Sequence, residues 1–149
     1  TLMGYNLTRS NMDNKTIGDA GEYFVAYNLS RRGLSAVLMN AGTKGVDILV
    51  TDDGKSVASL QVKSSQGKSQ PRQWMVGKKP PNPSDNFFYV FCNIWVDTER
   101  EPEVFIVPSI VVKETVDWDS KIPLFKIKPE QEEDFFNNWQ SILCLFPRV

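Results

Sequence analysis

The stretch "GVDILVTDDGKSVASLQVKSS", residues 45–65, predicts two strands joined by a tight turn at residues 52–54. Apolar and polar residues alternate on both sides of the turn, which is typical of a β-hairpin. The first strand opens with Asp47, and the second ends on the triplet Gln61-Val62-Lys63. Strands favour β-branched and aromatic residues, and polar groups on a face that should be buried are costly. These polar residues therefore indicate a role beyond folding.

Strand alternation places Asp47 on one face of the first strand, and Gln61 and Lys63 on one face of the second. If the strands pair around residues 53–54, Asp47 lies close to the level of Gln61 and Lys63. A carboxylate, an amide oxygen and an ammonium group then meet on one face of the sheet. We expect the preceding helix to pack across that face and to bring in Glu22.

The rest of the chain predicts a single α/β domain over residues 1–149, with a mixed central sheet flanked by helices. Residues 1–13 are expected to form a flexible arm. The first helix is expected to begin at a capping box, Thr16 with Asp19, and to stop at Gly33. Residues 65–86 are expected to be a long loop with one helical turn. Further strands are expected at 35–40, 86–96, 103–107 and 123–127, a short helix at 108–116, and a last helix from Pro129 that buries Phe135, Phe136, Trp139, Ile142 and Leu143.

The composition is that of an ordinary globular protein, with 41% hydrophobic and 23% charged residues among 149. No apolar run has the length of a membrane span and no signal peptide is recognisable, so we expect a cytoplasmic protein without membrane contact. The chain begins at Thr1, so we expect that an initiator methionine or a longer N-terminus has been lost. Cys92 and Cys144 are expected to be reduced core residues. The absence of histidine excludes Ser-His-Asp and Cys-His catalysis and His-ligated zinc.

The polar cluster on the hairpin suits hydrolysis of a phosphodiester. Asp47 and Glu22 offer the hard oxygen ligands that Mg²⁺ or Mn²⁺ prefers, and the side-chain oxygen of Gln61 and the backbone carbonyl of Val62 can complete the set. A bound metal would activate a water molecule and stabilise charge on the phosphate. Lys63 would position that water and neutralise the transition state.

The net charge of -1 gives no sign of a nucleic-acid partner, but residues 54–84 contain six lysines and arginines and no acid. This segment is either a basic face or a loop solvated by its lysines. Trp74 either stacks on an unpaired base or forms an aromatic lid packed back on the sheet. Ser64 and Ser65 either donate to a phosphate or merely end the strand. The candidate nucleic-acid-binding residues are Lys44, Ser64, Ser65, Lys68, Arg72, Trp74, Lys78 and Lys79.

"GVD", followed after thirteen residues by "QVK", resembles the motif of PD-(D/E)XK nucleases, and "GEYFVAYNL" is similar to the helix that carries their first glutamate. The resemblance is to Holliday-junction resolvases and to modification-dependent restriction enzymes, some of which use a Q-x-K form. It implies the restriction-endonuclease-like fold, with Asp47 and Glu22 as metal ligands and Lys63 as the catalytic lysine. Gln61 stands where an acid is usual, which implies weak metal affinity or reliance on one ion.

Three functions follow from these residues. The first is a metal-dependent endonuclease that cleaves DNA, which as a homodimer could act on both strands. The second is a non-catalytic DNA-binding, immunity or accessory protein on the same fold, with a protein partner. The third is a structural domain in which Asp47 and Lys63 form a buried ion pair.

Overall fold

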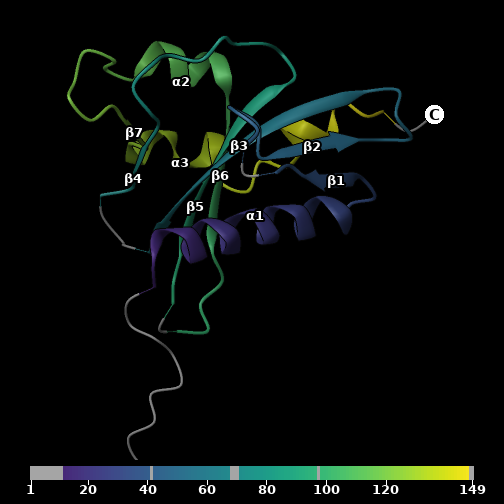
Figure 1. Cartoon of the computed structure of the whole chain (residues 1–149), viewed down its shortest axis with the longest axis horizontal. Coiled ribbons are helices and arrows are strands. Elements are labelled where there is room, and N and C mark those ends of the chain that lie inside the picture. Colours follow the sequence, from purple (N-terminus) through teal and green to yellow (C-terminus); the bar gives the residue numbers. More distant parts are fainter. Residues whose placement is uncertain (1–11, 41, 68–70, 97, 148–149) are drawn as a thin grey trace, which may run out of the picture.

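The computed structural model describes residues 12–40, 42–67, 71–96 and 98–147. A long helix comes first, strands make up most of the middle of the chain, and short helices lie near its C-terminal end (Figure 1). The elements are α1 (Asn14–Ser30), β1 (Ser35–Leu38), β2 (Ile48–Thr51), β3 (Val57–Gln66), β4 (Gln73–Met75), β5 (Phe87–Ile94), β6 (Glu103–Pro108), α2 (Ser109–Thr115), β7 (Leu124–Lys126), the 3-10 helix η1 (Pro129–Gln131), α3 (Glu132–Phe135) and α4 (Gln140–Leu143).

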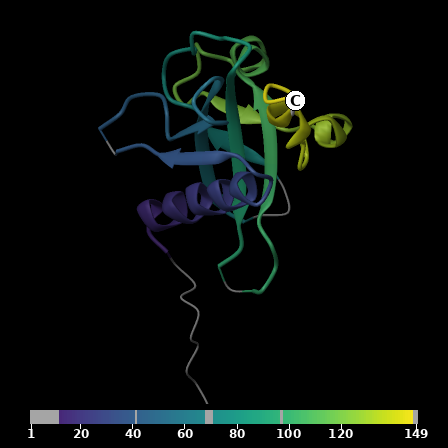
Figure 2. The same cartoon turned by 90° about the vertical axis from the view of Figure 1, so that its right-hand side faces the viewer.

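A five-stranded sheet in the order β1-β2-β3-β5-β6 forms the centre of the molecule (Figures 1 and 2). β3 and β5 run parallel, and the other neighbouring pairs are antiparallel. β5 is the continuous apolar run of the sequence, and it is buried on both faces because its alternate residues pack into two cores, one on each face of the sheet. The predicted α/β fold with a mixed sheet is therefore confirmed.

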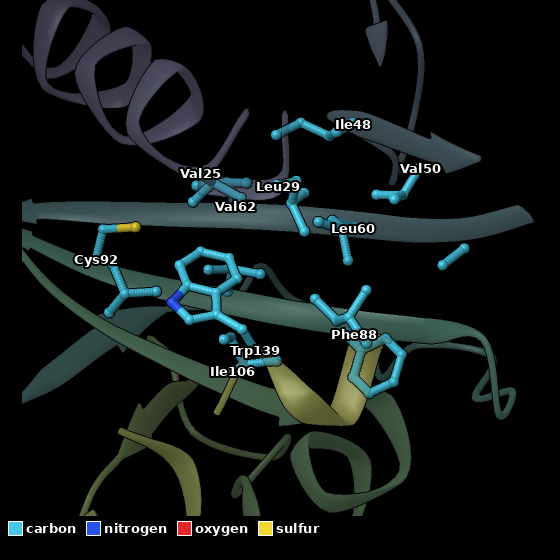
Figure 3. Packing of buried hydrophobic residues seen from close by; sticks show 14 of the residues in the cluster. Val25, Leu29, Ile48, Val50, Leu60, Val62, Phe88, Cys92, Ile106 and Trp139 are labelled. Carbon is cyan, nitrogen blue, oxygen red and sulfur yellow. The ribbon is translucent and has the colours of Figure 1, made fainter. Parts of the chain in front are cut away.

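Each face of the sheet carries its own hydrophobic core. On one face α1 packs Val25 and Leu29 against Leu60 and Val62 of β3, as Figure 3 shows. On the other face the small β4–β7 sheet packs aromatic residues against β5 and β6; Phe125 stacks on Phe91 with 4.6 Å between ring centroids. Since both faces are covered, polar groups on the sheet have few routes to solvent.

The predicted hairpin is confirmed, with Ile48 opposite Leu60 and Thr51 opposite Val57. Its turn uses left-handed backbone at Asp53 (φ 56°) and Gly54 (φ 81°), which these residue types tolerate. β2 pairs with only the first part of β3. From residue 61 to residue 66, β3 pairs with β5 on one side only, which leaves its other edge without a strand.

The start of the first helix differs from the prediction. Asp13 is the N-cap and accepts a hydrogen bond of 2.7 Å from the Thr16 backbone N–H, so the N-cap lies three residues before the expected Thr16. Met12 packs against the core, so residues 12 and 13 are not part of a flexible arm, and residues 1–11 lie outside the described residues. No described helix has both the length and the apolar character needed to cross a membrane.

The predicted last helix is wrong as a single element, because the chain breaks after α3. Phe136 is extended and forms a β-bridge with Phe105, and Asn137, with φ 50°, donates from its backbone to the Val104 carbonyl at 2.9 Å. A helix could not pair with the edge of β6 in this way. Phe136 is accordingly 46% exposed, whereas Trp139 is buried as expected. Cys144 is also exposed, against the prediction.

Candidate active site

Asp47, directly before β2, forms hydrogen bonds with the edge of β3. Its backbone N–H donates to the Leu60 carbonyl at 2.8 Å, and its side-chain Oδ2 accepts the Val62 N–H at 2.7 Å. The N–H and C=O of one strand residue face the same neighbour, so the Val62 carbonyl points toward this edge as well. A carboxylate and a backbone carbonyl therefore meet where β3 leaves its hairpin partner.

Glu22 reaches this edge from α1. The helix approaches β3 closely at Gly21, because a Cβ there would lie 3.1 Å from Ser64 Cβ and 3.6 Å from Cys92 Cβ and would collide with Ser64 Oγ. Burial raises the pKa of the Glu22 carboxyl, and the negative charge of Asp47 raises it further. The two carboxylates are therefore electrostatic neighbours that repel one another.

Gln61 and Lys63 lie on the opposite face from α1. In register they stand beside Tyr89 and Phe91, which belong to the second core, whereas α1 covers Leu60 and Val62. The expectation that the helix covers the face of Gln61 and Lys63 is therefore wrong. Glu22 instead interacts with Asp47 at the open edge of β3. The side chains of Gln61 and Lys63 are half-buried.

Asp47 and Lys63 do not form the ion pair that a purely structural role would require. The ion pairs within 4.0 Å among the described residues join Lys15 to Asp19, Arg72 to Glu103 and Glu132, and Arg100 to Glu103. The third interpretation of the sequence is contradicted in this respect. Lys63 instead lines a cleft at the end of β3, which the start of α1 and the β4–β7 pair also line.

The donors at this edge suit a single divalent cation better than a larger metal cluster. No group of three Asp, Glu, Cys or His side chains that could hold a metal exists in the described part of the chain. Two carboxylates and a backbone carbonyl nevertheless supply hard oxygen donors, which Mg²⁺ and Mn²⁺ prefer. The repulsion that raises the pKa of Glu22 would be relieved by a cation between the acids, so the residues present fit such an ion.

Two of the predicted nucleic-acid-binding residues are engaged inside the protein. Arg72 donates from Nε and Nη2 to the carboxylate of Glu103, at 3.1 and 2.9 Å, and from Nη1 to Glu132 at 3.0 Å. Trp74 is 3% exposed and donates from Nε1 to the Cys92 carbonyl at 2.9 Å. Trp74 therefore packs on the sheet, the second of the two alternatives, and contact of Arg72 with nucleic acid stays a prediction.

Residues 65–86, which were expected to form a long loop, contain β4, and Arg72 lies directly before that strand. Burial raises the pKa of the Glu103 carboxyl, but hydrogen bonds from Arg72 and Asn93 and the charges of Arg72 and Arg100 outweigh it and hold the pKa below its ordinary value. An asparagine in an apolar strand and a glutamate opening the next were the sequence signals for such a network. They were missed because their partner lies 31 residues away from Glu103 in the chain.

The other predicted nucleic-acid-binding residues are scattered. Lys44, Lys78 and Lys79 are exposed, and Lys68 lies outside the described residues. The Ser65 hydroxyl donates to Asn93 Oδ1 at 2.9 Å, and the Ser64 hydroxyl lies against Gly21. These contacts do not indicate that either serine donates to a phosphate. Nucleic-acid binding by the three exposed lysines stays a prediction.

The fold is shared with two solved nucleases. No protein family model and no curated protein matches the sequence. A bacterial homing endonuclease, I-Ssp6803I, is similar in structure with a TM-score of 0.58 and 16% sequence identity, over 89% of this chain and 93% of that one. The Holliday junction resolvase Hjc of Archaeoglobus fulgidus is similar with a TM-score of 0.50 and 13% identity, over 88% of this chain and 98% of that one. The chain thus has a restriction-endonuclease-like fold.

Proposed function

We propose that this protein is a metal-dependent endonuclease that hydrolyses phosphodiester bonds of DNA. The observation that carries the proposal is the meeting of Asp47, Glu22 and the Val62 carbonyl at the open edge of β3, next to Lys63. The fold agrees with this chemistry, but a fold alone does not define a function, so the site carries the argument.

Each residue has a distinct role in the proposed reaction. Asp47 and Glu22 hold Mg²⁺ or Mn²⁺ together with the Val62 carbonyl and the side-chain oxygen of Gln61. When bound, the cation lowers the pKa of a water molecule and offsets charge on the phosphate. Lys63 orients the attacking water and donates to the phosphate oxygen as negative charge grows there. Because Gln61 is neutral, the site has two carboxylates, and we expect weaker cation binding than a three-acid site would give.

The alternative is a non-catalytic DNA-binding, immunity or accessory protein on the same fold. The specific observation in its favour is that the described residues group only two acids, and not three, at the edge of β3. Such a protein would bind DNA or a protein partner without cleaving it. We expect a cytoplasmic location for either function.

The test is cleavage of single-stranded, linear duplex, supercoiled and four-way-junction DNA in Mg²⁺ or Mn²⁺. Asp47→Asn, Glu22→Gln and Lys63→Ala should each abolish cleavage. Asp53→Asn and Lys55→Ala, exposed on the same hairpin, serve as matched controls and should cleave as the wild type does. Undiminished cleavage by Asp47→Asn would refute the proposed site. Absence of cleavage on every substrate, with DNA binding retained, would favour the non-catalytic alternative.

We also propose that two copies pair through the β1 side of the sheet. β1 is an edge strand without charge or proline, the usual protections of an exposed edge, whereas the β6 edge is covered at Phe105 by the bridge from Phe136. Val37 and Leu38 of β1 are 49% and 43% exposed. An unprotected apolar edge of this kind is a template for pairing with another strand.

The outer face of α1, on the side away from the core residue Val25, also carries exposed aromatic residues. Tyr23 and Tyr27 are 61% and 58% exposed, and Asp19 and Arg31 lie one turn beyond them on either side. Sedimentation should show a dimer that Val37→Lys dissociates, and a monomer in the wild type at all concentrations would disprove the pairing.

A further inference from the structure

We propose that the cleft beside Lys63 binds an unpaired nucleobase next to the cleaved phosphate, an inference that rests on the proposed function. The cleft has a volume of about 550 Å³, within the range of small-molecule sites. It lies between the start of α1, the end of β3 and the β4–β7 pair, which are on the same side of the molecule in Figure 1. The walls that the argument uses come from Lys63, Ser65, Gln73, Met75, Ile122 and Leu124.

The cleft and the candidate active site share one residue, Lys63, whereas Asp47 and Glu22 do not line the cleft. Lys63 is both the proposed water-positioning residue and part of the cleft wall, and the three residues that follow it in β3 also line the cleft. At about 3.3 Å per residue, these three positions extend about 10 Å from Lys63. A phosphate held at the edge of β3 therefore has its neighbouring nucleotide within reach of this space.

The chemistry of the lining fits a base and not a phosphate. Lys63 carries the only charge among the described residues that line the cleft. The affinity of proteins for phosphates comes mainly from the charge of arginine and lysine, and amides and hydroxyls can also pair with the hydrogen-bonding edge of a base. The Gln73 side chain, half-buried in the wall, supplies both an amide donor and a carbonyl acceptor. A neutral planar ligand with polar edges is therefore the class that this cleft would accept.

The apolar part of the wall is exposed and held in place. Met75 and Ile122 are 66% and 58% exposed, which is unusual for large apolar side chains unless they serve contact. Val76 donates from its backbone to the Pro123 carbonyl at 3.3 Å, which ties the two segments together, and Trp74 anchors β4 to β5 through its bond to Cys92. Thioether and branched aliphatic groups on a fixed support can pack on the face of an aromatic base.

A base in this cleft cannot remain paired in a duplex. The preferred substrate is therefore DNA with an unpaired nucleotide beside the scissile phosphate, because such a base enters without the cost of unpairing. A fully paired duplex would have to flip that nucleotide first. The cleft thus assigns a substrate preference that the metal-binding edge alone does not give.

The test uses Asp47→Asn protein in EDTA and DNA carrying 2-aminopurine at an unpaired position. Entry of the base into the cleft should raise its fluorescence. Ile122→Ala should weaken binding of this DNA about tenfold, as expected for loss of part of a base-stacking contact. Ile110→Ala is the matched control, since Ile110 is 44% exposed on α2 and does not line the cleft. DNA with an abasic site at the same position should not distinguish the two variants.

The outcomes separate this inference from the proposed function. If the wild type cleaves DNA but Ile122→Ala binds the unpaired base as tightly as Ile110→Ala does, the base site is overturned and the nuclease stands. If selective weakening is found without any cleavage by the wild type, the base site stands and the nuclease falls. Absence of DNA binding by every form of the protein overturns both.

Discussion

The hydrogen bond from Val62 to Asp47 makes the candidate metal ligand a structural residue as well. In Asp47→Ala the Val62 N–H loses its acceptor at 2.7 Å, and an unsatisfied buried donor costs about 1–3 kcal/mol. Asp47→Asn keeps an oxygen that can accept the same bond while it removes the negative charge. We therefore expect Asp47→Ala to be less stable than Asp47→Asn by about 1–3 kcal/mol.

The charge of Asp47 has an opposing effect through Glu22. Because burial and Asp47 raise the pKa of Glu22 in the folded protein, the folded state binds this proton more tightly than the unfolded state does. Stability from this group is therefore greatest below the ordinary Glu value of 4.5 and falls as the pH rises through the raised pKa. Asp47→Asn should reduce this fall, since it removes one of the two main causes.

Urea unfolding followed by tryptophan fluorescence at pH 4 and pH 7 would measure both effects, since the chain has four tryptophans. Mg²⁺ at about a hundred times its dissociation constant should stabilise the wild type at pH 7 by about 2.7 kcal/mol and should stabilise Asp47→Asn far less. Equal stability of the two Asp47 variants would refute the role of the Val62 bond.

Three further outcomes follow from the packing. Arg72→Met should lower the free energy of unfolding by about 3 kcal/mol in the same assay, because Glu132 loses its partner and the half-buried Glu103 keeps only Arg100 and Asn93. Gly21→Ala should destabilise by up to about 2 kcal/mol through collision with β3, whereas Gly18→Ala, with open space around it, should stabilise by about 1 kcal/mol. One thiol should react with a disulfide reagent at pH 8 in the native protein and two in urea, because Cys144 is exposed while burial raises the pKa of Cys92 to about 12.

The hairpin and the central strand could be predicted because their signals are local. Alternation over residues 45–65 gives the strand faces directly, and the turn chemistry at residues 52–54 gives the register. That register pairs Ile48 with Leu60, so Asp47 lies close to the level of Gln61, as the sequence indicated. The uninterrupted apolar run of β5 likewise indicates a strand covered on both faces.

The remaining features depend on partners that are distant in the chain. Alternation defines two faces but not which of them a helix covers, so α1 was expected on the face of Gln61 and Lys63. Arg72 resembles a surface base until Glu132, 60 residues later, is known to lie beside it. The break before Asn137 is likewise caused by the edge of β6 and not by any local helix signal.

The neutral Gln61 has a consequence for how the site forms before a cation binds. The pKa of Glu22 is already raised by burial and by the negative charges of Asp47 and Asp19. A second acid at position 61, on the half-buried edge that Asp47 completes, would add repulsion within the same few residues of β3. Gln61 avoids that repulsion while it keeps an oxygen donor. Under the proposed function, the two carboxylates can therefore keep their folded arrangement without metal, but they bind a cation more weakly than three would. Gln61→Glu should raise the affinity for the cation and lower the stability of the metal-free protein.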